Sequence, residues 1–173
     1  VNLNYQSLAL SNPAFALPQT QGFGWGVTAG LVWRFNDALQ FGAAWSSKQR
    51  MQELEWNTGG GKISLRMDAP QTLAVGLAWR PVAGLLVEGD VKQIWFSKVL
   101  GAVPINRPAG YSGPVPAVMN FGWSDQTVLA VGVQKDIGES MQLRAGFNYG
   151  KSPIGPENVN ANIGSLAVVE KHL

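Results

Sequence analysis

The sequence lacks cysteine and is poor in charged residues, and both features limit the class of protein. It contains no cysteine, and only 14% of its 173 residues are charged, against roughly 25% in an average soluble domain. A chain without cysteine has no disulfide framework, which suits a periplasmic or outer-membrane protein that needs none. The net charge is only +2 and no run of basic residues occurs, so nucleic acid is not an expected partner.

The residue sets that carry enzyme chemistry are also missing. His172, near the end of the sequence, is the single histidine. We find no Ser–His–Asp arrangement, no cluster of metal ligands and no phosphate-binding loop. The sequence therefore predicts a protein that is not an enzyme and that holds neither a cofactor nor a metal ion.

Long apolar runs are absent, although the chain is rich in apolar residues. No run reaches the roughly 18 residues that a membrane helix requires, yet 46% of the residues are hydrophobic, with seven tryptophans and 21 glycines. This combination is typical of membrane strands, because each strand carries its apolar residues at every second position.

The stretch from Gly22 to Trp79 shows this alternation most clearly. Its first predicted strand has the odd positions Trp25, Val27, Ala29, Leu31, Trp33 and Phe35 and the even positions Gly26, Thr28, Gly30, Val32 and Arg34. A period of two indicates a strand with two different faces. One face is bulky, apolar and aromatic at both ends, so we expect it to contact lipid while the other lines a polar lumen.

About eight strands are expected along the chain. They are residues 1–10, 22–35, 39–56, 62–80, 85–95, 127–135, 141–149 and a last strand within 166–173. Tight turns are predicted at 36–37, 81–84 and 136–140, a glycine hairpin at 59–61, and long loops at 11–21, 97–121 and 150–165. Short turns alternate with long loops in membrane barrels. Pro70 lies within the expected strand 62–80, where proline marks an edge, a bulge or a local opening of the wall.

These patterns predict an all-β protein, a transmembrane antiparallel β-barrel in which residues 1–173 are part of a single domain. The chain begins at Val1 without an initiator methionine, so we expect a piece of a longer protein. Eight strands could close a small barrel. A larger barrel is favoured by the small residues expected on the lumen face, namely Gly26, Gly30, Gly42, Gly76, Gly132 and Gly146.

Two long runs of the sequence, residues 67–99 and 120–158, resemble the FadL/TodX-type outer-membrane transporters of long-chain fatty acids and hydrocarbons. In the second run, Trp123-Ser124-Asp125, Arg144-Ala145-Gly146 and Ser152-Pro153-Ile154 stand in the family's order and spacing. The resemblance extends from about Gly22 to Leu173. It implies a 14-stranded barrel closed by an N-terminal plug that this chain does not include. It also implies a ligand that outer loops capture, the lumen binds and a gap in the wall releases.

Charged residues on the expected lumen face are the first candidates for ligand binding. Arg66, Lys92 and Arg144, with Arg34 and Lys48, are the cations that could meet a ligand carboxylate. The alternative is that they only wet the lumen or form ion pairs within it. Glu88 and Asp90 share a strand face with Lys92, so we expect these three to neutralise one another in part.

The predicted loop 97–121 is unusually apolar and supplies a second candidate site. Leu100, Val103, Ile105, Tyr111 and Met119 are its proposed capture residues. Exposed apolar patches often mark binding sites, although such a loop could also pack on itself.

We therefore expect passive uptake of hydrophobic molecules across the outer membrane of a Gram-negative bacterium. The partners would be membrane lipid and a hydrophobic small molecule, and the protein would be a monomer. Two alternatives stay open: a structural or adhesive barrel without transport, and a soluble lipocalin-like carrier that buries the bulky odd positions. The sequence does not distinguish a fatty acid from an aromatic hydrocarbon.

Overall fold

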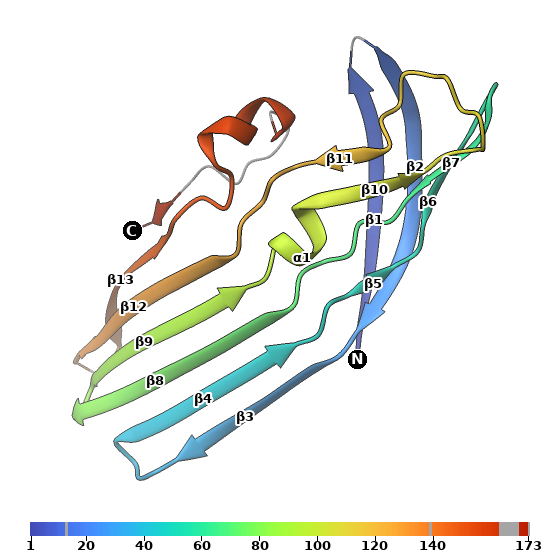
Figure 1. The fold of residues 1–173 in the computed structure, drawn as a ribbon. Helices are drawn as coiled ribbons and strands as arrows, with labels where there is room; N and C mark the ends of the chain where they lie inside the picture. The colour runs from blue at the N-terminus through green and yellow to red at the C-terminus, as the bar shows by residue number, and fades with distance from the viewer. Residues whose placement is uncertain (13, 139, 163–169, 173) are drawn as a thin grey trace.

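The computed structural model describes residues 1–12, 14–138, 140–162 and 170–172, and this part of the chain is mainly β-structure (Figure 1). The strands are β1 (Asn2–Asn12), β2 (Phe15–Gly26), β3 (Thr28–Arg34), β4 (Leu39–Ser46), β5 (Arg50–Met51), β6 (Leu54–Thr58), β7 (Gly61–Leu65), β8 (Thr72–Val82), β9 (Leu85–Ile94), β10 (Ala102–Asn106), β11 (Val118–Asn120), β12 (Gln126–Ile137), β13 (Met141–Gly150) and β14 (Lys171–His172). A short α-helix, α1 (Ser97–Leu100), and a 3-10 helix, η1 (Pro156–Asn162), complete the described elements. No helix in these ranges is long and apolar enough to cross a membrane.

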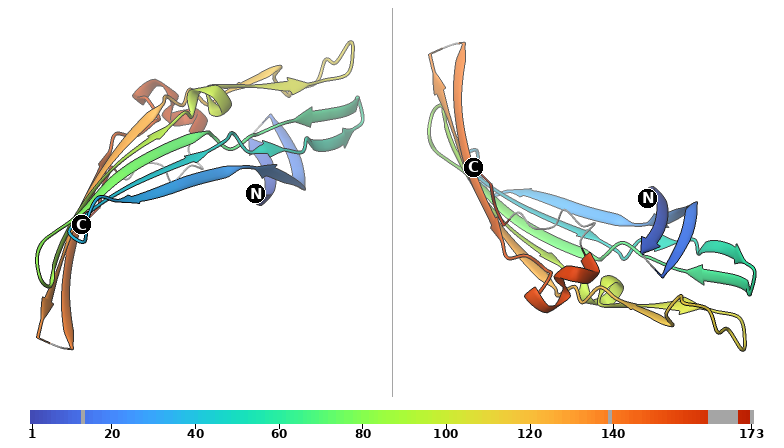
Figure 2. Two further views of the ribbon diagram at one scale, coloured as in Figure 1. Left: turned by 90° about the horizontal axis from the view of Figure 1, so that it is seen from below. Right: turned by 90° about the horizontal axis from the view of Figure 1, so that it is seen from above.

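Seven strands form one antiparallel sheet, which we call the lower sheet. Its order is β14-β13-β12-β9-β8-β4-β3, and Figure 2 shows that it is strongly curved. Its predicted tight turns at 36–37 and 81–84 are confirmed, because β3 pairs with β4 and β8 with β9 across them. The side chain of Asn36 stabilises the first turn by accepting hydrogen bonds from the backbone of Ala38 and Leu39, at 2.9 and 2.8 Å. The sheet does not close on itself within the described residues.

The lower sheet has two faces that follow residue parity. Odd residues pair with odd residues, for example Trp33 with Phe41 and Val131 with Phe147, except at the register shift where Val82 pairs with Leu85. We therefore call its two sides the odd face and the even face. Large apolar side chains of the odd face are exposed, as at Leu129 (49%), Val131 (59%) and Trp79 (50%). No other layer of the described residues covers these side chains, whereas a soluble lipocalin-like carrier would bury them.

The remaining strands form two smaller sheets, which we call the upper tier. One has the order β1-β2-β5 and the other β11-β10-β7-β6; in Figure 1 they lie above and to the right of the lower sheet. Between them lies a buried apolar cluster of Leu17, Leu54, Trp56, Ile63, Leu65, Val103, Ile105 and Val115. The indole of Trp56 donates a 2.6 Å hydrogen bond to the carbonyl of Pro18, which joins the two sheets. The upper tier therefore has a buried apolar core of its own.

Three strands that the sequence predicted as continuous are interrupted, and those predictions are wrong in length. The predicted strand 22–35 divides at Val27, 39–56 divides into β4, β5 and β6, and 62–80 divides into β7 and β8 around residues 66–71. Side chains replace backbone partners at the interruptions. The Ser47 hydroxyl accepts from Val27 N at 3.0 Å, and the Asp68 carboxylate accepts from Met51 N at 2.9 Å. Pro70 lies in the gap between β7 and β8 and has no N–H to donate.

Two predicted loops are also wrong. Residues 11–21 contain the end of β1 and the start of β2, and Pro18 fits there because Pro18 and Gln19 together oppose Ala9 in a bulge. Residues 97–121 contain α1, β10 and β11, and β10 pairs with β7. The loop 150–165 contains η1. Most of the predicted last strand lies outside the described residues, which include only Lys171–His172 of it as β14.

Candidate functional site

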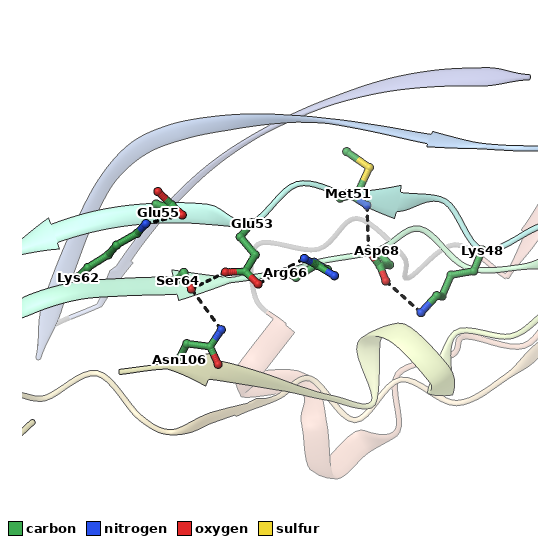
Figure 3. A network of polar contacts seen from close by, with 9 residues as sticks. All are labelled: Lys48, Met51, Glu53, Glu55, Lys62, Ser64, Arg66, Asp68 and Asn106. Atoms are coloured by element: carbon green, nitrogen blue, oxygen red, sulfur yellow. Dashed lines mark hydrogen bonds and ion pairs between the residues drawn. The ribbon is translucent and has the colours of Figure 1, made fainter. Parts of the chain in front are cut away.

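The five cations predicted to bind a carboxylate do not converge on one site. Arg66 and Lys48 lie at the junction between the lower sheet and the upper tier, and both are engaged in ion pairs (Figure 3). Arg34, Lys92 and Arg144 lie on the even face of the lower sheet, on three different strands. We describe these two groups in turn.

Arg66 belongs to a polar network that connects β7 and β10 with Glu53, the residue before β6. Its guanidinium lies 3.3 Å from Oε1 of Glu53, and the other oxygen of Glu53 accepts a 2.8 Å hydrogen bond from the Ser64 hydroxyl. Asn106 of β10 donates to the same hydroxyl at 3.2 Å. Figure 3 shows the contacts that join Arg66, Glu53, Ser64 and Asn106. The charge of Arg66 is thus already matched by a carboxylate of the chain itself.

Lys48 is matched in the same way. Its ammonium lies 3.1 Å from Oδ2 of Asp68, while Oδ1 of Asp68 accepts the backbone N–H of Met51. The carboxyl side chain is only 12% exposed. Asp68 therefore has a structural role at the strand interruption, and Lys48 balances its charge.

The even face of the lower sheet carries the other three cations far apart. Arg144 donates 2.8 Å hydrogen bonds to the side chains of Gln134 and Gln142. On the neighbouring strand, Gln134 is opposite Leu86 of β9, and Lys92 lies six residues farther along the same strand. Arg144 and Lys92 are therefore separated by roughly 20 Å along the strand direction. Lys92 forms no ion pair with Glu88 or Asp90 within the described residues, and the partial neutralisation of these three charges stays a prediction.

Small residues cover the part of the even face between these charges. Gly42, Gly76, Ala44, Ala74 and Ala78 contribute to a shallow hollow of about 520 Å³, which Glu88 and Asp90 also border. The carboxylate of Asp90 lies directly over Gly76, where any side chain would displace it. This surface combines small residues with the carboxylates of Glu88 and Asp90, which is compatible with a lumen wall.

A larger hollow of about 920 Å³ lies in the upper part of the molecule, and we call it the upper hollow. One of its sides comes from the hairpin β1–β2, and the other comes from α1, β11, η1 and the chain around Trp123. Its lining is Leu8, Ala9, Leu10, Ser11, Phe15, Met67, Leu100, Pro116, Val118, Met119, Asn120, Phe121, Trp123, Asn160, Ala161 and Asn162. Several of these side chains pack on the buried cluster of the upper tier, so the hollow has a firm apolar floor.

Asn162 holds the second wall of the upper hollow together. Its amide nitrogen donates to the carbonyls of Phe121 and Asn158 at 2.7 and 2.8 Å, and its oxygen accepts from the indole of Trp123 at 2.7 Å. Asn162 is only 9% exposed. All the strong hydrogen-bonding positions of this amide except one lone pair are thus used to fix the wall.

Two of the three sequence motifs that carried the family resemblance, Trp123-Ser124-Asp125 and Ser152-Pro153-Ile154, meet in this wall, whereas Arg144-Ala145-Gly146 lies on β13. Trp123 forms a β-bridge with Ile154, and Ser124 N donates to the carbonyl of Pro153 at 2.8 Å. The carboxylate of Asp125 accepts from the backbone of Ser97 at the start of α1, at 2.9 Å. The ring of Trp123 also contacts Phe96 edge to face, at 4.9 Å between centroids. These residues connect α1, β12 and η1 into one unit.

The predicted capture residues divide into three groups. Leu100 and Met119 line the upper hollow. Val103 and Ile105, at 2% and 6% exposure, lie in the core beneath it, because alternate residues of β10 point into the upper tier. Tyr111 packs on this core and receives the guanidinium of Arg107 over its ring at 5.6 Å.

The sequence analysis missed the lining residues of the opposite wall. Leu8 and Leu10 precede the β1–β2 turn and Phe15 follows it. The signal available was the apolar alternation on both sides of residues 11–14, which is typical of a hairpin. For metals, no group of three or more ligating side chains occurs within the described residues.

Comparison with known proteins adds to this geometry. The sequence profile of a family described as outer membrane protein transport protein (OMPP1/FadL/TodX) matches residues 6–165. Curated protein sequences give no match.

Solved structures share the fold at low sequence identity. The toluene transporter TbuX of Ralstonia pickettii superposes with a TM-score of 0.60 and 19% identity, over 79% of this chain and 38% of its own. The toluene transporter TodX of Pseudomonas putida gives 0.58 and 21%, over 78% and 37%. A FadL homologue of Pseudomonas aeruginosa gives 0.61 and 17%, over 88% and 44%. The chain therefore spans less than half the length of each of these proteins.

Proposed function

Because the chain belongs to the OMPP1/FadL/TodX family of outer-membrane transport proteins, as its sequence motifs predicted, we propose that it is part of a transporter for passive uptake of hydrophobic small molecules. Residues 1–173 would contribute adjacent wall strands and outer segments to a single larger barrel in a Gram-negative outer membrane. The family and the solved relatives are transporters and channels rather than enzymes. We expect the assembled protein to be a monomer.

The observation that carries this proposal is the exposed apolar odd face of the lower sheet. Trp33 and Trp79 lie near its tight turns and Trp45 and Tyr149 near its other end. Such aromatic residues at both edges of an apolar band match the two interfaces of a bilayer. In this orientation the short turns face the periplasm and the upper tier stands outside the cell.

The upper hollow is the proposed capture site. It opens in the tier that would meet the external medium, and its volume of about 920 Å³ lies within the range of small-molecule pockets. Leu100 and Met119 would contact the ligand there. Arg34, Lys92 and Arg144 would keep the even face wet, and Arg66 and Lys48 would stabilise the junction between the tiers.

Uptake by cells tests this proposal. A strain without its own transporter of this family would express the complete protein, and accumulation of radiolabelled toluene would be followed over time. We expect faster accumulation than in cells without the protein. Ala161→Trp, which fills the upper hollow from an exposed lining position, should reduce uptake to the background, whereas Val159→Trp on the same 3-10 helix, outside the lining, should not. Equal accumulation with and without the protein would contradict the proposal.

A further inference from the structure

We infer that the upper hollow selects uncharged ligands over carboxylates, an inference that rests on the proposed capture function. The sequence left open whether the ligand is an anion such as a fatty acid or a neutral aromatic hydrocarbon. The lack of charge in the lining and the pairing of the neighbouring charged residues favour the neutral ligand.

The lining of the upper hollow carries no charged side chain within the described residues. It consists of aliphatic, aromatic and methionine side chains, with one serine and three asparagines. A carboxylate placed in such surroundings loses its hydration and gains no counterion, whereas a methyl ester of the same skeleton loses far less.

The nearest cation along the chain is not free to compensate. Of the residues adjacent in sequence to the lining, only Arg66 and Asp68 are charged, on either side of Met67. Arg66 is paired with Glu53, and Asp68 with Lys48. Each pair is neutral overall, so recruiting Arg66 to a ligand would leave the carboxylate of Glu53 without its cation.

The polar groups that remain suit a neutral ligand. Both N–H groups of Asn162 are used in holding the wall, but Asn120 and Asn160 are exposed in the lining. An amide there could donate one hydrogen bond to an ester carbonyl. Phe15, Phe121 and Trp123 offer aromatic faces and edges to a ring.

Competition binding with matched ligand pairs tests the inference. The complete protein in lipid nanodiscs would be loaded with an uncharged naphthylamine fluorophore, whose displacement reports binding. The competitors are decanoate with methyl decanoate, and benzoate with methyl benzoate, at neutral pH. We expect each ester to displace the fluorophore at a concentration at least about tenfold lower than its carboxylate, and Ala161→Trp to abolish loading.

A charge placed in the lining provides the reverse test. Val118 lines the hollow and is 42% exposed, so a long side chain is tolerated there. Val118→Lys should strengthen binding of both carboxylates by about tenfold and leave the esters nearly unchanged, because an opposite charge at short range favours the anion. Val159→Lys is the matched control, at 53% exposure and outside the lining, and should change neither.

The outcomes separate the two proposals. Ester preference together with the Val118→Lys gain supports the selection of uncharged ligands. Carboxylates that bind wild type as tightly as their esters, with both lost in Ala161→Trp, would overturn the selection and leave capture intact. If neither class displaces the fluorophore, or the fluorophore does not bind, capture in the upper hollow and the selectivity both fail.

Discussion

The strands of the lower sheet and of the upper tier both alternate apolar and polar residues, but their apolar faces differ in exposure. In the lower sheet the large apolar side chains are exposed, as at Val131 (59%) and Leu77 (47%). In the upper tier they are buried, as at Leu54 and Ile63, both with 0% exposure. Alternation therefore identifies a strand with two faces, but only the neighbouring layer decides which face is covered.

The neighbouring layers of the two regions differ in a simple way. The β1-β2-β5 sheet supplies Leu17 to the apolar cluster of the upper tier, so two sheets cover one another. The odd face of the lower sheet has no such cover among the described residues, and we propose that lipid provides it. The ion pairs of Arg66 and Lys48 lie at the junction between the regions. We expect this junction to be covered neither by lipid nor by the apolar core.

Truncating the core of the upper tier should have the largest effect. Leu54→Ala removes a fully buried side chain, and such changes cost about 2–5 kcal/mol of unfolding free energy. We expect hydrogen exchange to rise sharply in residues 54–65 and to stay unchanged in residues 127–137 of the lower sheet. Leu54→Met, which conserves volume, should cost less than about 1.5 kcal/mol. An equal rise in both regions would mean that they do not unfold separately.

A charge on the odd face tests whether lipid covers it. Val131→Arg should cost about 2–4 kcal/mol in a bilayer, since an arginine at mid-height on a lipid-facing strand is unfavourable. Val159 of η1 is similarly exposed, at 53% against 59%. Val159→Arg should change stability by no more than about 0.5 kcal/mol, as at an ordinary wet surface. Denaturant titration in lipid vesicles measures both, and matching small effects would argue for water on the odd face.

Loss of the amide at Asn162 should loosen one wall of the upper hollow. In Asn162→Asp a carboxylate would face the carbonyls of Phe121 and Asn158 and could no longer donate to either. Leaving such buried groups unsatisfied costs about 1–3 kcal/mol. We expect faster hydrogen exchange in residues 156–162, while Asn160→Asp, which adds the same charge at an exposed position without a side-chain hydrogen bond, should have little effect. Unchanged exchange in Asn162→Asp would show that the wall is held by other contacts.

The lower sheet could be predicted because its determinants are local. Parity, aromatic ends and turn residues such as Asn36 are all readable within a few positions. The interruptions at Val27 and around Pro70 could not be read in the same way, because the alternation continues through them. They depend on side chains that bond to distant backbone, such as Asp68 to Met51.

The upper hollow was predictable only in part for a related reason. The apolar character of residues 97–121 indicated a binding surface, and Leu100 and Met119 do line the hollow. Pairing of β10 with β7 brings together residues about 40 positions apart, so the burial of Val103 and Ile105 could not be derived from the segment itself. The partners of Arg66 and Lys48 are likewise set by the tertiary fold.

The ion pair between Arg66 and Glu53 should give the smallest effect of the changes considered. Glu53→Gln removes the charge but keeps an oxygen that can accept from Ser64. Since the two side chains are 48% and 35% exposed, the pair should contribute only about 0.2–1 kcal/mol, and less at high salt. The same variant sharpens the ligand question, because it frees Arg66 next to the upper hollow. If Arg66 can reach a ligand in the upper hollow, Glu53→Gln should improve carboxylate binding. Unchanged binding at low salt would mean that Arg66 stabilises the junction and does not contact the ligand.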